Sequence, residues 1–137
     1  MNILITGNMG YVGGNLVAYL RKKYPQAALF GLDSGFFAHC ITGKTILPET
    51  RVTSQYFADI RNFSLPLLKG VDVIVHLAAL SNDAISNLDE NLTLDVNHRA
   101  TAHLARAAKA AGVSSFVFAS SCSVYGWGYT GCKLVFK

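Results

Sequence analysis

The residues best placed for chemistry lie near the start of the chain, where three glycines are spaced Gly7-x-x-Gly10-x-x-Gly13. In such a loop the first glycine permits a tight turn after a strand, and the second lets backbone N–H groups approach a pyrophosphate. The third allows close packing of a helix on the strand, and the helix N-terminus favours the anion. We therefore predict a dinucleotide-binding loop, although three glycines alone would also suit a simple turn. The residues between the glycines that complete this loop are Asn8, Met9, Tyr11 and Val12.

An acidic residue stands where a dinucleotide loop needs a partner. Asp33 follows Gly13 by 20 residues and ends an apolar stretch. A carboxylate there accepts hydrogen bonds from the ribose hydroxyls of adenosine and repels a 2′-phosphate, and the adjacent Ser34 supplies no cation. This pair predicts NAD rather than NADP. The alternative is that Asp33 only begins a turn with Ser34 and Gly35.

Alternating strands and helices are expected to position these residues. Apolar and β-branched runs predict strands at 3–5, 28–33, 55–59, 72–80 and 116–120. Apolar residues at helical spacing predict helices at 13–24 and 92–111, with a short helix at 63–69 and an irregular connection at 34–54. The alternation predicts an α/β fold, a Rossmann-type doubly wound parallel sheet of about five strands in the order 3-2-1-4-5. Ligands of such sheets bind beyond the carboxyl ends of the strands.

Composition narrows the class of protein. The 137 residues suit one domain, 1–137, and 51% of them are hydrophobic while 15% are charged. No apolar run reaches the length of about 18 residues that a membrane span needs, so we expect a soluble, cytoplasmic protein with no membrane partner. The net charge of +4 includes one basic cluster, at 21–23, which suits a helix end better than nucleic-acid binding. Three cysteines without CxxC spacing predict neither disulfides nor a metal site.

Six short segments resemble the extended short-chain dehydrogenase/reductase family, the NAD-dependent nucleotide-sugar epimerases and dehydratases. In family order they are TGNMGYVG (6–13), GLD (31–33), ADIRN (58–62), HLAAL (76–80), VNHRAT (96–101) and SSCSVYG (120–126). Together they span nearly the whole chain, which is similar to the N-terminal part of that family. The resemblance implies NAD as cofactor and a nucleotide-sugar as a possible second ligand.

The resemblance also implies contacts to the cofactor. Asp59 and Ile60 would contact the adenine, with a helix cap as the alternative for Asp59. Asn97 would bridge the backbone to the cofactor region, unless it is an exposed helical residue. His76 is expected to pack in its strand rather than to act in catalysis. The small and apolar residues implied to line the cofactor channel are Leu77, Ala78 and Ala79, and Ser120 is implied as a further cofactor contact.

Catalysis in this family uses a tyrosine base, a lysine four residues later and a serine or threonine that positions the sugar oxygen. The register of SSCSVYG places the serine at Ser121. The segment YTGCK has the required spacing between Tyr129 and Lys133. It follows Ser121 by only eight residues and is surrounded by glycines, which disfavour a helix, so a chance match is the alternative.

These observations predict an NAD-binding domain that lacks a complete catalytic site, as if truncated after strand five. Two alternatives are a short working oxidoreductase that uses Ser121, Tyr129 and Lys133, and a nonenzymatic NAD-binding regulatory module. An apolar edge at 116–120 would favour association, so a homodimer through this edge or the helix 92–111 is expected. Residues 133–136 could instead cover the edge.

Overall fold

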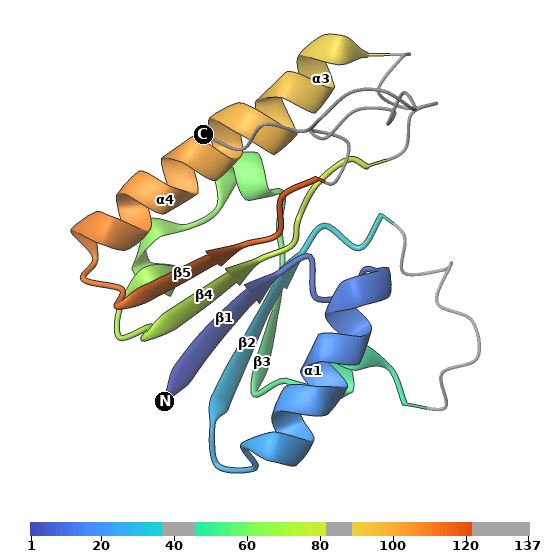
Figure 1. Ribbon diagram of the computed structural model, residues 1–137, viewed down its shortest axis with the longest axis vertical. Coiled ribbons are helices and arrows are strands. Elements are labelled where there is room, and N and C mark those ends of the chain that lie inside the picture. Colours follow the sequence, from blue (N-terminus) through green and yellow to red (C-terminus); the bar gives the residue numbers. More distant parts are fainter. Residues whose placement is uncertain (37–45, 82–88, 122–137) are drawn as a thin grey trace, which may run out of the picture.

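The computed structural model describes residues 1–36, 46–81 and 89–121, which form a five-stranded parallel sheet between helices (Figure 1). The strand order is β3-β2-β1-β4-β5, which confirms the predicted doubly wound sheet. The strands are β1 (Asn2–Thr6), β2 (Ala28–Asp33), β3 (Ser54–Phe57), β4 (Val73–His76) and β5 (Ser115–Phe118). Their carboxyl ends therefore meet at one edge, where the loop after β1 begins.

Helices cover both faces of the sheet. Helix α1 (Tyr11–Lys23) lies on one face, and a long helical segment lies on the other, as Figure 1 shows. That segment consists of α3 (Glu90–Leu94), a π-helical stretch (Asp95–Ala100) and α4 (Thr101–Ala110). The two faces have separate cores because alternate residues of a strand point to opposite sides. A strand buried on both faces reads as a continuous apolar run, which is why β1 was evident from sequence.

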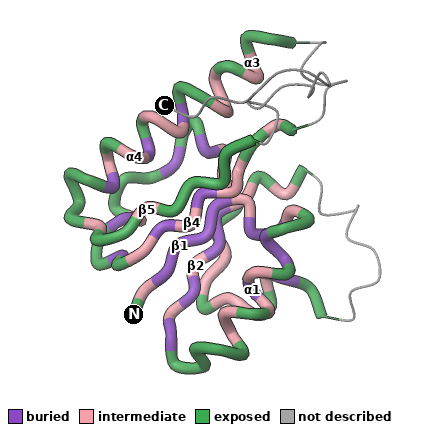
Figure 2. Tube along the Cα trace, in the orientation of Figure 1, coloured by how far each residue is buried: buried purple, intermediate pink, exposed green. Residues whose placement is uncertain are grey.

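The two cores meet across β1. Ile3 and Ile5 pack with Val17 of α1, whereas Leu4 packs with Leu104 of α4. Figure 2 shows the buried residues concentrated in the central strands, while β5 is exposed along most of its length. The sheet is therefore more deeply buried at its central strands than at β5.

Several boundaries differ from those predicted. β4 ends at His76 instead of residue 80, because the backbone of Leu80 is hydrogen-bonded to the side chain of Asn97 and has left the sheet. The predicted helix 63–69 is a 3₁₀ helix, Leu65–Leu68, which has a proline in its first turn. The predicted helix 92–111 begins at Glu90, where the Asp89 side chain caps the N–H of Leu92.

The connection predicted as irregular, 34–54, contains a 3₁₀ helix at Pro48–Arg51, and its residues 37–45 lie outside the described part. Within the described ranges, no helix combines the length and apolar character needed to cross a membrane. The same ranges hold no group of three or more His, Cys, Asp or Glu side chains arranged to bind a metal ion.

Candidate cofactor site

The glycine-rich loop wraps tightly between β1 and α1. Gly7 has φ +72°, and a Cβ atom there would come within 2.9 Å of the backbone of Leu77 and Ala78. A Cβ atom at Gly13 would overlap the carbonyl oxygen of Gly7 and the Cα atom of Asn8. Gly13 therefore lets α1 pack against its own preceding loop, whereas the sequence predicted close packing against the strand.

Asp33 lies at the end of β2, directly beside this loop. Its Oδ2 accepts a hydrogen bond from the backbone N–H of Met9 at 3.0 Å, and its Oδ1 accepts one from Gly35 at 2.8 Å. The carboxylate thus both begins the turn at 33–35 and holds the loop, so the two interpretations from the sequence are not exclusive. A carboxylate can accept about four hydrogen bonds, which leaves capacity for two ribose hydroxyls.

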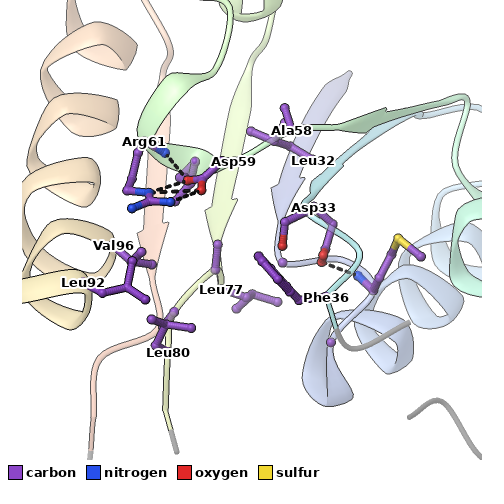
Figure 3. A pocket seen from close by; sticks show the side chains of 17 residues that line it. Leu32, Asp33, Phe36, Ala58, Asp59, Arg61, Leu77, Leu80, Leu92 and Val96 are labelled. Carbon is purple, nitrogen blue, oxygen red and sulfur yellow. Dashed lines mark hydrogen bonds and ion pairs between the residues drawn. The ribbon is translucent and has the colours of Figure 1, made fainter. Parts of the chain in front are cut away.

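A pocket of about 200 Å³ opens beside Asp33 at the carboxyl ends of the strands (Figure 3). Glycine-loop and β2 residues form one wall, and apolar side chains from the helical segment form the opposite wall. The predicted cofactor residues that line it are Gly7, Met9, Gly10, Asp33, Ser34, Asp59, Ile60, Leu77, Ala78 and Ala79. Ten residues that the sequence predicted as cofactor contacts thus line the same pocket. Their contacts with a cofactor remain predictions.

An ion pair between Asp59 and Arg61 forms part of the pocket lining. The Asp59 carboxylate accepts hydrogen bonds from Arg61 Nε at 3.0 Å and Nη2 at 2.6 Å, and from the Arg61 backbone N–H at 2.8 Å. These hydrogen bonds hold the pKa of Asp59 below its usual range, so its carboxylate stays ionised. Asp59 caps the short 3₁₀ helix Ile60–Asn62, as the alternative interpretation proposed. The capped turn therefore fixes the position of Arg61 beside Asp59.

Asn97 holds the loop that follows β4. Its Oδ1 accepts from the backbone N–H of Leu80, and its Nδ2 donates to the carbonyl of the same residue, both at 2.8 Å. The interpretation of Asn97 as an exposed helical residue is therefore wrong. It lies in the π-helical stretch, a type of local distortion that is frequent at functional sites. The neighbouring Val96 lines the pocket, so this stretch serves both the wall and the loop.

His76 is the last residue of β4 and is fully buried. Its Nδ1 is 2.6 Å from Thr6 Oγ1, and its Nε2 is 2.8 Å from Thr101 Oγ1. Burial lowers the pKa of His76 to about 4, so the ring is neutral near pH 7. Its ring also stacks on Phe118 of β5, with 5.7 Å between centroids. These contacts join β1, β4, β5 and α4, which fits the packing role expected of His76.

Other predicted site residues lie away from the pocket. Tyr11 is 92% exposed at the start of α1, and Val12 beside it is also exposed. Ser120 and Ser121 are exposed after the end of β5. The structure does not bring these residues to the pocket wall. The predicted catalytic residues Tyr129 and Lys133 lie outside the described part of the chain.

Sequence reasoning missed part of the pocket wall. Arg61 was within a segment quoted for the family resemblance, and its position two residues after Asp59 was the available signal. Phe36, which Figure 3 shows beside the pocket, had no such signal because it borders the aperiodic connection. The remaining lining residues that were not predicted are Leu32, Ala58, Leu80, Leu92 and Val96.

A family model described as the NAD dependent epimerase/dehydratase family matches residues 3–132. The chain belongs to this family. Membership agrees with the resemblance seen in the sequence and with the fold. The predicted cofactor, NAD, is confirmed as the cofactor of the family.

Known proteins similar to the chain carry related descriptions. A UDP-glucose 4-epimerase of Vibrio cholerae is 34% identical, over 96% of the chain and 38% of the relative. The solved structure of MoeE5 in complex with UDP-glucose and NAD matches with a TM-score of 0.77 and 31% identity, over 97% of the chain and 40% of that structure. A UDP-glucose-4-epimerase from Stenotrophomonas maltophila with bound NAD and formylated UDP-arabinopyranose matches with a TM-score of 0.75 and 28% identity. That match covers 96% of the chain and 40% of the structure.

The chain spans between 36% and 42% of the length of the first relatives that it matches. The matched part corresponds to the sheet and the glycine-rich loop described above.

Proposed function

We propose that residues 1–121 form the part of an NAD site that holds the adenosine and pyrophosphate, within a nucleotide-sugar epimerase or dehydratase. The observation that carries this proposal is the position of Asp33. Its carboxylate contacts the glycine-rich loop on one side and lines an apolar pocket on the other. A ribose placed there would join a pyrophosphate over the loop to a base in the pocket.

Each part of the site has a distinct task in this proposal. Backbone N–H groups of the loop and the N-terminus of α1 stabilise the pyrophosphate, because unpaired donors and the helix dipole favour an anion. Asp33 accepts from the ribose hydroxyls, and its charge disfavours a 2′-phosphate. The apolar wall, which includes Leu92 and Val96, removes the flat faces of the base from water. When bound, NAD supplies a hydride acceptor for oxidation of a sugar alcohol.

The nucleotide-sugar part of the proposal is supported by the relatives, whose printed names include UDP-glucose 4-epimerases. In this proposal the Ser121 hydroxyl positions the sugar oxygen, and Tyr129 and Lys133 act as base and as the cation that lowers the pKa of that base. Ser121 follows the carboxyl end of β5, on the same edge of the sheet as the loop. The described residues thus supply the cofactor contacts and one candidate catalytic hydroxyl.

Titration with NAD and NADP tests the cofactor assignment. We expect NAD to bind at least about tenfold more tightly, because the Asp33 carboxylate would repel the 2′-phosphate of NADP and the adjacent Ser34 supplies no cation. Calorimetry gives both dissociation constants. Equal affinity for the two dinucleotides would contradict the role of Asp33, and no binding of either would refute the proposal.

Incubation with UDP-glucose and NAD separates a working enzyme from a binding module. Turnover that disappears in Tyr129→Phe would support the short oxidoreductase. Binding of NAD without turnover of any nucleotide-sugar would favour a domain that only binds the cofactor. A regulatory role for that domain would then show as an NAD-dependent change in its association with another protein.

We also propose that the protein forms a homodimer. Val117 and Phe118 on β5 are 53% and 49% exposed, and such an apolar edge strand favours pairing with another strand. The mass in solution, measured by light scattering over a range of concentrations, tests it. A monomeric mass at the highest concentration would refute it.

A further inference from the structure

Asn8 lies in the middle of the glycine-rich loop, yet its side chain is fully buried and does not line the pocket. Its Nδ2 donates a 2.7 Å hydrogen bond to Oε1 of Gln55, and Gln55 Nε2 donates back to Asn8 Oδ1 at 3.3 Å. Gln55 belongs to β3, two strands away from β1. The loop is thus tied to a distant strand by a reciprocal pair of amides.

The two amides meet beside Gly31 of β2, in the space that a side chain at this position would fill. Gly31 faces Gln55 across the ladder between β2 and β3. A Cβ atom on Gly31 would lie 2.5 Å from Asn8 Nδ2 and even closer to Gln55 Oε1. The hydrogen-bonded pair therefore requires an amide at both Asn8 and Gln55 and no side chain at Gly31.

The same part of the loop is fixed from its other side. The Cα atom of Asn8 packs where Gly13 lacks a side chain, and the N–H of the next residue, Met9, is bonded to Asp33. Residues 8 and 9 are consequently held by α1, by β2 and by β3. A loop fixed in this way does not lose conformational freedom when it binds an anion, which favours affinity.

We infer that the Asn8–Gln55 pair positions the glycine-rich loop for the pyrophosphate of the cofactor, and that Gly31 is required to admit the pair. This inference rests on the proposed binding of NAD. Asn8 and Gln55 are positioning residues, because neither side chain lines the pocket. Removing the Gln55 amide leaves the buried amide of Asn8 without this partner, which forces the loop to move.

The test compares Gln55→Leu with the unmodified chain. Leucine has a similar size but cannot pair with Asn8, and we expect the dissociation constants of NAD and ADP-ribose to rise about tenfold. Competition against reduced NAD gives the affinity for adenosine, which lacks the pyrophosphate and should change less than twofold. Ala108→Gly, in the buried face of α4 away from the pocket, is the matched control. It should lower the midpoint of thermal unfolding while leaving both dissociation constants within twofold.

A second pair of variants tests Gly31. We expect Gly31→Ala to weaken NAD binding as Gln55→Leu does, because its Cβ displaces both amides. Adding Gly31→Ala to Asn8→Ala should cost less than adding it to the unmodified chain, since one of the two amides that its Cβ meets is then absent. If Gln55→Leu does not fold, Gln55→Glu is measured in its place. It keeps the acceptor for Asn8 Nδ2 and removes only the donor, so the dissociation constant of NAD should rise about threefold.

The outcomes are distinct. Absence of NAD binding by the unmodified chain would refute the proposed function and this inference together. Normal binding by the unmodified chain and by the Gln55 variants, with a lower unfolding midpoint in the variants, would show that the pair only stabilises the fold. An equal loss for adenosine and ADP-ribose would also overturn the inference, because the pair would then shape the base pocket rather than the loop.

Discussion

At the ends of β1 and β2 the chain buries its polar groups and pairs them, whereas after the end of β5 it leaves its serines on the surface. Thr6 and Asn8 are fully buried and hydrogen-bonded, and Asp33 holds the loop between them and α1. Ser120 and Ser121 are exposed, and β5 forms the edge of the described sheet. The contrast teaches that the described residues position one another in the part of the site proposed to hold the cofactor. The predicted catalytic contacts depend on residues outside the described ranges.

The largest expected effect comes from crowding the loop itself. Gly13→Ala places a Cβ atom into the backbone of Gly7 and Asn8, so we expect the free energy of unfolding to fall by about 3 kcal/mol and NAD binding to be lost. Urea unfolding and NAD titration measure the two effects. Gly14→Ala is the matched control, because its Cβ meets only the ring of Pro48, at 3.0 Å. Equal stability of the two variants would show that the loop is less tightly built than its contacts indicate.

The next largest expected effect comes from removing the carboxylate of Asp33 beside the loop. Asp33→Ala loses charge-assisted hydrogen bonds to the ribose, and we expect NAD binding to weaken by about 2 kcal/mol, with a smaller loss for NADP. Asp72→Ala provides a control at the opposite end of the sheet, where Asp72 bonds the N–H of Asn2. An unchanged dissociation constant in Asp33→Ala would remove the ribose assignment.

A pH titration tests how firmly β5 is coupled to the cofactor side, because His76 contacts both. Its pKa falls from 6.5 to about 4 on burial, so the unfolded chain binds a proton first as the pH is lowered. Stability is therefore full above pH 6.5 and is lost between 6.5 and 4. Between pH 7.5 and 5.5 we expect a loss of about 1.4 kcal/mol in the free energy of unfolding.

Two variants isolate this contribution to the pH dependence. His76→Gln should make stability nearly independent of pH over that range, whereas His98→Gln, at an exposed position of the π-helical stretch, should keep the loss. Asp59 does not interfere, because its lowered pKa confines its contribution to more acidic solutions. Identical slopes for the unmodified chain and His76→Gln would show that protonation of His76 is not linked to unfolding.

The smallest expected effect concerns the serine after β5. Ser121→Ala should change NAD affinity by less than about 0.5 kcal/mol, because the exposed serine does not line the pocket. The same titration measures it, and any turnover of a nucleotide-sugar should fall in this variant. A loss of NAD affinity comparable with that of Asp33→Ala would extend the cofactor site to the end of β5.

Apolar runs predicted the sheet because strands buried on both faces contain few polar residues. The same property misled the prediction at HLAAL, which was extended to Leu80. Leu77 to Leu80 are apolar because they line a pocket, and a sequence pattern cannot separate that cause from burial in a sheet. The interaction that decides the boundary is made by Asn97, 17 residues away.

The residues of the site also divide into those that the sequence could reveal and those that it could not. Asp33 could be found because its distance from the glycines along the chain reflects one strand–helix–strand unit. Val96 could not, since it reaches the pocket from a π-helical stretch that interrupts the regular helical period. The role of Asn8 was also out of reach, because its partner, Gln55, is defined only by the order of the strands.

The central place of β1 has a consequence for synthesis on the ribosome. Residue 3 pairs with residue 73, and the turn at Gly7 packs on Leu77 and Ala78. At about 5–20 residues per second, β1 is synthesised roughly 4 to 14 seconds before its partner strand β4. During that interval β1 can pair only with β2, and the cofactor loop has no opposing wall. The earliest part of the site to be synthesised is therefore completed by one of the last.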